Sequence, residues 1–370
     1  MTNILGGPLV LRCGLVLGNR LVKSAMAESL ATDHGLPTPR HARLYERWAQ
    51  GGAGLLVTGN VMIDPEHRVA ARDVVARADA QGSYAAWVAS ASRHGVPVLM
   101  QLNHPGRQTP RRLCAHPVAP SAVKLERAAW LFAAPRALDE REIVGIVARF
   151  ASAAALAERS GFAGVEVHAA HGYLLSQFLS PKVNGRRDGY GGTAEARGRI
   201  LVEVVRAIRQ ATSPGFALAV KLNADDFERG GLELADSIAI ARRLDDEGID
   251  LLEITGGTYA SDTLLGRASP GREPYFAQYV RALRPQCAVP LILTGGHRDP
   301  DRMAALVAAG AHDLVGLARP LVLVPDLPRR ILAGERPALV EPTFVPIPGV
   351  VSALALRWYT QRLQALADGA

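Results

Sequence analysis

The chain has 370 residues, of which 48% are hydrophobic and only 5% aromatic, so it can bury a large core made mainly of aliphatic side chains. Its formal net charge of +7 comes from arginines and lysines that are scattered along the chain, which argues against a nucleic-acid partner and favours a small anionic ligand such as a phosphate-bearing cofactor. The three cysteines are isolated, which predicts a protein without disulfides or iron–sulfur clusters. No apolar stretch is long enough for a membrane span, and the amino terminus lacks the early positive charges of a signal peptide. We therefore expect a soluble, cytoplasmic protein.

The first elements are two short apolar runs within residues 6–18, which predict a hairpin that plugs the amino-terminal end of the fold. Eight further runs have the length and composition of buried strands: 21–26, 54–58, 97–102, 163–167, 217–222, 250–254, 290–294 and 313–317. Amphipathic segments that predict helices lie between them: 40–50, 80–94, 139–160, 193–211, 232–247 and 300–309. Eight βα units predict a (β/α)8 TIM barrel. A doubly wound open sheet is the alternative, but no Gly-x-Gly-x-x-Gly sequence follows the first strand.

Two segments fall outside the repeating units. Residues 104–135 are rich in proline and arginine and have no clear period, which predicts a lid or pocket wall after the third strand. Residues 337–370 begin with a proline-rich extended stretch and end in a helical pattern, which could pack on the barrel or on a neighbouring subunit of a homo-oligomer. We therefore expect residues 1–336 to form one barrel domain, with 337–370 as an extension rather than a second domain.

Polar side chains follow the fourth predicted strand. His168, His171 and Tyr173 come directly after the run 163–167, at the edge of an α/β barrel where catalytic groups collect. Their spacing could aim two imidazole N–H donors and a phenol into one pocket, as stabilisers of an oxyanion and as a proton donor. They could equally be polar residues of a strand-to-loop junction whose hydrogen bonds are made within the protein. His-x-x-His supplies only two ligands to a zinc ion, and no nearby cysteine or carboxylate cluster completes the set, so no metal is predicted.

Glycine pairs follow the sixth and seventh predicted strands, at 256–257 and 295–296, and Arg319 follows the eighth. Glycines allow backbone N–H groups to approach a ligand closely, and the loops after the last two strands of a barrel commonly bind phosphate. Arg319 would add charge-assisted hydrogen bonds. A Gly-Gly pair alone is also common in tight turns, so it is the combination that predicts a phosphate site.

Several motifs in this order resemble the old yellow enzyme family of FMN-dependent ene-reductases, over roughly residues 3–335. They are Asn19-Arg20-Leu21-Val22-Lys23-Ser24-Ala25-Met26, Gln101-Leu102 with His104-x-Gly106-Arg107, His168-Ala169-Ala170-His171-Gly172-Tyr173-Leu174, Phe178-Leu179-Ser180-Pro181, Asn184, Arg186-x-Asp188-x-Tyr190-Gly191-Gly192, Thr294-Gly295-Gly296 and Ala318-Arg319. The resemblance implies a (β/α)8 barrel that binds FMN at the carboxyl ends of its strands and uses NAD(P)H as reductant. The residues that it implies for cofactor binding are Ala25, Met26, Ala27, Gly59, Gln101, His168, Lys221, Gly295, Gly296, Ala318 and Arg319.

The resemblance also implies the chemistry. Hydride would pass from flavin N5 to the β-carbon of an α,β-unsaturated carbonyl compound, while His168 and His171 bind the carbonyl oxygen and Tyr173 protonates the α-carbon. A flavin-dependent desaturase or isomerase acting on a pathway intermediate is the alternative. A non-catalytic flavin- or ligand-binding protein is a third hypothesis, and it would make the histidines and the tyrosine vestigial.

The chain departs from the family at several positions. Ala27 stands where many members have a threonine or cysteine that contacts the flavin, and Lys221 replaces the common arginine near flavin N1, which keeps the charge but loses the bidentate fork. Glu28 could face the pocket or solvent, and Ser29 falls where some relatives use a tyrosine to close the substrate site. Asn184, Arg186, Asp188 and Tyr190 are expected to brace the loop after the fourth strand rather than touch substrate.

Overall fold

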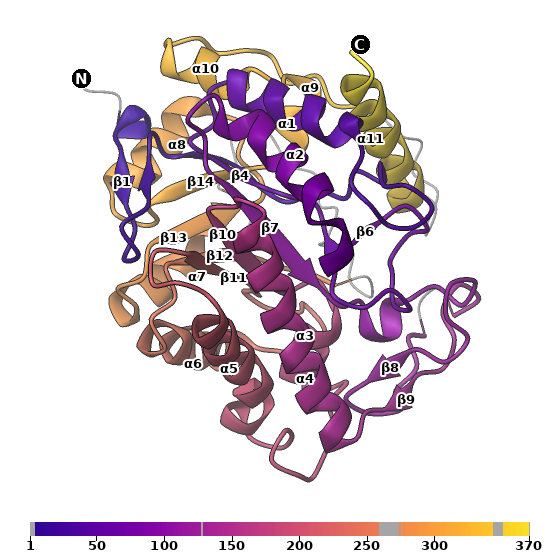
Figure 1. Cartoon of the computed structure of the whole chain (residues 1–370). Coiled ribbons are helices and arrows are strands. Elements are labelled where there is room, and N and C mark those ends of the chain that lie inside the picture. Colours follow the sequence, from indigo (N-terminus) through magenta and orange to yellow (C-terminus); the bar gives the residue numbers. More distant parts are fainter. Residues whose placement is uncertain (1–3, 127–128, 259–273, 275, 343–350, 370) are drawn as a thin grey trace.

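A barrel of eight parallel strands forms the centre of the computed structural model, which describes residues 4–126, 129–258, 274, 276–342 and 351–369 (Figure 1). The strands are β3 (Leu21–Lys23), β4 (Leu55–Val57), β7 (Val98–Asn103), β10 (Gly164–Ala169), β11 (Ala217–Asn223), β12 (Leu251–Thr255), β13 (Leu291–Thr294) and β14 (Leu314–Leu317). Each pairs in parallel with its neighbours, and the pairing of β14 with β3 and of β7 with β10 closes the barrel. The predicted (β/α)8 barrel and its eight strands are confirmed.

Helices surround the strands. They are α1 (Pro39–Gln50), α2 (Gln81–Ser92), α3 (Glu140–Arg159), α4 (Leu174–Leu179), α5 (Ala194–Ala211), α6 (Leu234–Asp246), α7 (Ala277–Leu283), α8 (Pro300–Ala308), α9 (Arg319–Leu323), α10 (Leu327–Leu332) and α11 (Val351–Ala367). Short 3-10 turns are η1 (Ile4–Gly6), η2 (Ala78–Ala80), η3 (Gly106–Gln108) and η5 (Arg284–Gln286). The longest, α3, begins at a capping box in which Asp139 accepts from the backbone N–H of Glu142, and it buries the apolar stripe that includes Ile143 and Phe150.

Two short strands close the amino-terminal end of the barrel, as predicted. β1 (Leu9–Val10) pairs in antiparallel fashion with β2 (Val16–Leu17). Leu11 and Leu17 of this hairpin are buried against the inward-facing side chains of the strands, among them Val22 and Leu99. Burying a leucine side chain contributes roughly 1.5–3 kcal/mol. The hairpin is therefore the floor of the barrel, which leaves the carboxyl ends of the strands as the place for a site.

The segment 104–135 lies beside the loop after β10, and its predicted role as a lid or pocket wall stays a prediction. Its described residues contain η3 and β8 (Val118–Ala119), which pairs with β9 (Arg136–Ala137), and β8 packs against α4 and η3. The guanidinium of Arg186 donates to the carbonyl oxygens of Pro120 and Leu138, which ties the segment to the loop after β10. These contacts draw the segment to the outside of the barrel, and none of its described residues lines the central cavity.

The carboxyl-terminal helix α11 packs on the barrel beside α1 and α9 (Figure 1). Arg40 forms an ion pair with Asp368 at 2.6 Å, and Nε of Arg43 donates to the carbonyl oxygen of Ala367. Exposed ion pairs contribute little, so the buried side chains of Leu363 and Leu366 must supply most of the attachment. The helix thus packs on its own barrel, and contact with a neighbouring subunit stays a prediction.

The remaining elements are β5 (Val61–Met62), which pairs with β7, and β6 (Val74–Val75), which pairs with β5.

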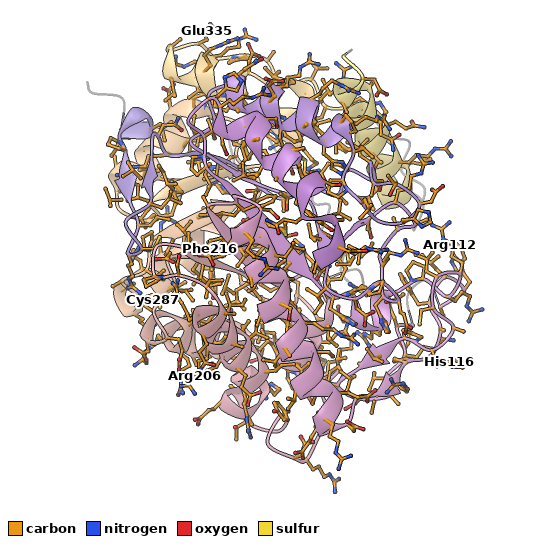
Figure 2. The ribbon with its side chains drawn as sticks, in the orientation of Figure 1. Arg112, His116, Arg206, Phe216, Cys287 and Glu335 are labelled. Carbon is orange, nitrogen blue, oxygen red and sulfur yellow. The ribbon has the colours of Figure 1, made fainter. Side chains whose placement is uncertain are left out.

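Figure 2 shows Arg112 and Arg206 at different edges of the molecule, in keeping with cations that are dispersed rather than collected on one face. Among the described residues, no helix combines the length and apolar character needed to cross a membrane.

Candidate active site

A cavity opens at the carboxyl ends of the strands, and it brings together most of the residues predicted for cofactor binding and catalysis. The predicted residues that line it are Ala25, Met26, Ala27, Gln101, His168, His171, Tyr173, Lys221, Gly295, Ala318 and Arg319. They come from six separate stretches of sequence. β3 is shorter than predicted, so Ala25, Met26 and Ala27 lie beyond the ladder and form one wall of the cavity.

Two residues predicted to bind the cofactor, Gly59 and Gly296, do not line the cavity. The backbone N–H of Gly59 points away, donating to Glu28 and to the Tyr45 hydroxyl at 3.1 Å each, while the next residue, Asn60, faces the cavity. Gly296 has a positive φ of 86° beside Gly295, whose φ is 120°. These backbone conformations favour glycine and shape the loop after β13. A direct role of Gly59 or Gly296 with a cofactor stays a prediction.

His168, His171 and Tyr173 lie together in the cavity. The ring of His168 is 5.1 Å from that of His171 and 4.9 Å from that of Tyr173, measured between centroids, and both contacts are edge-on. His171 adopts a positive φ of 60°, its backbone N–H donates to Asn223, and its Nε2 lies 3.1 Å from the hydroxyl of Thr255. The strained turn is thus held by polar contacts on both sides and directs the ring into the cavity.

Both imidazoles are neutral near pH 7. Burial holds the pKa of His168 well below its usual value, and the neighbouring His171 and Lys221 lower it further. The pKa of His171 is also lowered, by removal from water and by the charge of Lys221, although this ring retains partial exposure to the cavity. Since Nδ1 of His168 accepts from the backbone N–H of Ala170, its proton lies on Nε2. His168 therefore presents an N–H donor rather than a charge.

A network of four buried polar side chains lies inside the barrel, on the strands behind the cavity. Nε2 of Gln101 donates to Glu166 at 2.6 Å, and Nζ of Lys221 contacts Glu253 at 2.7 Å. Lys221 is 3% exposed, so its charge is held inside the barrel. Oε1 of Gln101 has no hydrogen-bond partner among the described residues. An amide oxygen buried in this way at a cavity wall indicates a missing ligand donor.

The charges in this network largely compensate one another. Burial would lower the pKa of Lys221, but the carboxylates of Glu253 and Glu166 outweigh it and raise that pKa. Burial and the neighbouring Glu253 raise the pKa of Glu166 well above its usual value, so Glu166 holds a proton. Lys221 and Glu253 thus form an ion pair, and the lysine brings less net positive charge to the cavity than an unpaired cation would.

Glu28 faces neither the pocket nor solvent, contrary to both sequence-based alternatives. Its carboxylate accepts from the Tyr45 hydroxyl at 2.5 Å and from the backbone of Gly59, and it lies 3.6 Å from Nζ of Lys23. Burial lowers the pKa of Lys23 to about 8, although Glu28 opposes this shift. The carboxylate turns inward because Lys23 and Tyr45 offer it partners in the core. Glu28 supports the strand end next to Ala27 from behind.

The loop after β10 is braced as predicted. The amide of Asn184 donates to the carbonyl oxygens of Phe178 and Tyr190, and the guanidinium of Arg186 grips Asp188. These contacts stay within the loop and its neighbours, and none of these side chains lines the cavity.

Sequence reasoning missed part of the cavity wall. The lining residues that it did not single out are Asn60, Thr255, Phe276, Leu356, Tyr359, Thr360 and Leu363, whereas Gly256 and Thr294 belong to the glycine pair and the motif already noted. Thr255 directly follows a predicted strand, so its position alone could have identified it. The residues from α11 carry no such signal, because only the packing of this helix on α1 brings them to the cavity.

The sequence pattern of the NADH:flavin oxidoreductase / NADH oxidase family matches residues 7–337. One similar protein is the NADH-dependent flavin oxidoreductase iliE of Neonectria sp. (strain DH2), 42% identical in an alignment of length 355 that covers 88% of this chain and 46% of that protein. Another is the NADH-dependent flavin oxidoreductase iccE of Talaromyces variabilis, 37% identical in an alignment of length 401 that covers 97% of each chain. The chain thus spans about half of the first relative and nearly all of the second.

Solved structures agree with the fold. Morphinone reductase superposes with a TM-score of 0.79 at 29% identity, over 93% of this chain and 92% of that one. The old yellow enzyme homologue from Zymomonas mobilis gives a TM-score of 0.80 at 25% identity, over 97% of this chain and 99% of the other.

Proposed function

Because the chain belongs to the NADH:flavin oxidoreductase / NADH oxidase family and is an oxidoreductase of the old yellow enzyme type, we propose that it is an FMN-dependent NAD(P)H ene-reductase acting on α,β-unsaturated carbonyl compounds. Bound FMN would supply the hydride that is added to the β-carbon. The observation that carries the proposal is the meeting of His168, His171 and Tyr173 in a cavity that also contains Gln101 and Lys221.

The residues present fit a flavin. Oε1 of Gln101 is buried without a partner among the described residues, as expected of an acceptor for a ring N–H. Lys221 faces the same cavity and could donate to a carbonyl oxygen of the ring. Arg319, with Gly295 and Ala318 nearby on the cavity wall, would bind the phosphate through charge-assisted and backbone hydrogen bonds.

The substrate would be bound by the neutral histidines. His168 presents Nε2–H, which can donate to a carbonyl oxygen and to the enolate-like charge that develops there. A neutral donor keeps its proton and stabilises the charge without transferring it, which leaves proton transfer to another group. We assign that step to the Tyr173 hydroxyl, which would protonate the α-carbon.

A flavin-dependent desaturase or isomerase is the second candidate, and Ala27 favours it. A methyl side chain cannot donate to the flavin where many relatives place a threonine or cysteine, so that route of tuning the potential is closed. Glu28 gives this candidate no support, since its carboxylate is engaged in the core.

Anaerobic rapid mixing tests the two candidates. Purified protein should carry FMN or take it up, should be bleached by NADH or NADPH, and should be reoxidised by cyclohexenone. Colourless protein that cannot be reconstituted with FMN would contradict both candidates. No response to either nicotinamide, with bleaching by a saturated ketone, would favour the desaturase.

A further inference from the structure

A second cluster of ionisable side chains lies outside the cavity. Asp64 and His67 follow β5, His104 follows β7, and Cys114 comes from the 104–135 segment. Asp64, His67 and His104 are all buried, whereas Cys114 is half-buried. None of the four lines the central cavity, and the proposed ene-reductase chemistry uses none of them.

The imidazole of His67 lies between the carboxylate and the thiol. Its Nδ1 is 3.2 Å from Oδ2 of Asp64, and its Nε2 is 3.9 Å from Sγ of Cys114. A carboxylate can only accept, so Nδ1 carries the proton and the lone pair of Nε2 faces the thiol. Asp64 stays ionised: burial would raise its pKa, but hydrogen bonds from His104 and His67 outweigh this and hold the pKa far below its usual value.

The same residues could be read as a metal site, since ligand atoms of Asp64, His67 and His104 lie within 4.8 Å of one another. Three contacts oppose this reading. Nδ1 of His104 accepts from the backbone N–H of Gly106 at 3.0 Å, so its Nε2, which faces Asp64, carries a proton and has no lone pair for a metal. Arg149 already contacts the Asp64 oxygen that a metal would need. Cys114 lies on the far edge of His67 and cannot complete the ligand set.

We propose that Cys114 is a reactive thiol, with His67 as its base and Asp64 as the group that orients His67, and that it is modified covalently by soft electrophiles of the Michael-acceptor class. His67 Nε2 takes the thiol proton, and Sγ bonds to the β-carbon of the electrophile while the C=C electron pair moves toward the carbonyl oxygen. The α-carbon then takes up the proton from the imidazolium. The net result is addition of S–H across the double bond, without an oxidant, a reductant or the flavin.

The site is open to reagents. Figure 2 shows Arg112 and His116, each two residues from Cys114, at the outer edge of the molecule, and Cys287 at the opposite side. The other two cysteines are built-in controls. Burial raises the pKa of Cys13, and it raises the pKa of Cys287 to about 11. Neither has a histidine partner among the described contacts.

The test is timed labelling of the FMN-loaded protein with N-ethylmaleimide, quantified for each cysteine by peptide mass spectrometry. We expect Cys114 to react at least on the order of tenfold faster than Cys13 or Cys287, and His67→Gln to remove most of that advantage. Loss of structure in a variant would be recognised because unfolding increases labelling of all three cysteines. His116→Gln, an exposed histidine in the same segment, is the matched control and should leave the rates unchanged.

Labelling of Cys114 no faster than that of Cys13, or an unchanged rate in folded His67→Gln, would overturn the proposal. Stoichiometric zinc binding seen by native mass spectrometry, lost in His67→Gln and protecting Cys114, would also overturn it in favour of a metal site.

Discussion

Two pairs of histidines in this molecule have similar ring spacing and opposite surroundings. His168 and His171 lie with centroids 5.1 Å apart, and His67 and His104 lie 4.6 Å apart. Among the described residues, no carboxylate hydrogen-bonds to the first pair, which faces the cavity beside Lys221. In the second pair, both rings face the carboxylate of Asp64.

The difference shows that the partner of the second ring nitrogen decides what an imidazole can do. In His168 a backbone N–H occupies Nδ1, so Nε2 is a neutral donor suited to a carbonyl oxygen. In His67 a carboxylate occupies Nδ1, so Nε2 is an acceptor suited to a thiol proton. Burial keeps the first pair neutral, whereas a shared carboxylate anchors the second.

Tyr173→Phe tests whether the cavity pair needs a separate proton donor, and it should have the largest effect. Alkene reduction should fall by at least about 100-fold, as is typical for loss of a general acid, while flavin reduction by NADH changes little. Stopped-flow measurement of each half-reaction checks this. Tyr190→Phe, in the braced loop outside the cavity, is the control. Equal losses in both half-reactions would remove Tyr173 from the proton-donor role.

Asp64→Asn tests the anchored pair. The neutral amide lacks the negative charge that His67, His104 and Arg149 contact in the native protein. The free energy of unfolding should therefore fall by about 2 kcal/mol in denaturant titrations. Because the pKa of Asp64 is depressed in the fold, its contribution is present above pH 4 and lost as pH falls below that. The variant should therefore lose part of the acid sensitivity. Asp79→Asn, at the exposed pair with Arg77, should have no measurable effect.

The cavity pair should show its own pH dependence of stability. The pKa of His168 is far below 6.5 in the fold, so below pH 6.5 the unfolded chain takes up a proton that the folded chain does not. Stability is full above pH 6.5, and this group alone weakens it by up to about 2 kcal/mol at pH 5. His168→Gln should flatten the profile between pH 7 and 5, whereas His116→Gln should not. An unchanged profile would mean that His168 titrates alike in the folded and unfolded chains, which would contradict its lowered pKa.

Glu253→Gln should have the smallest effect, and it changes the charge beside the cavity pair. Without Glu253, Lys221 would present more positive charge to the cavity, so the midpoint potential of bound flavin should rise by tens of millivolts, roughly 1 kcal/mol. Spectroelectrochemical titration measures the shift. Glu247→Gln, at an exposed ion pair with Arg206, is the control. A lower potential would contradict the proposed ion pairing.

The sequence predicted the features that depend on local periodicity and on motif order. Eight short apolar runs became the eight strands, and the hairpin of residues 6–18 became the floor. The cavity residues after β10 were predicted because strand ends share one edge of a barrel.

The features that depend on distant packing were not predicted. Tyr359 and Leu363 reach the cavity only through the docking of α11 on α1, and Glu28 turns inward only because Lys23 and Tyr45 meet it there. The contacts of the segment 104–135 with the loop after β10 also join residues distant in sequence, and no local pattern indicates them. The cluster around His67 escaped notice because its members come from three loops and match no spacing rule.

The position of α11 has a consequence for the order of events during synthesis. All eight strands precede Ala318, so the barrel and its floor can fold before residues 351–367 leave the ribosome. The cavity wall made by Leu356, Tyr359, Thr360 and Leu363 is added afterwards. A cofactor bound as proposed would therefore gain this side of its enclosure last.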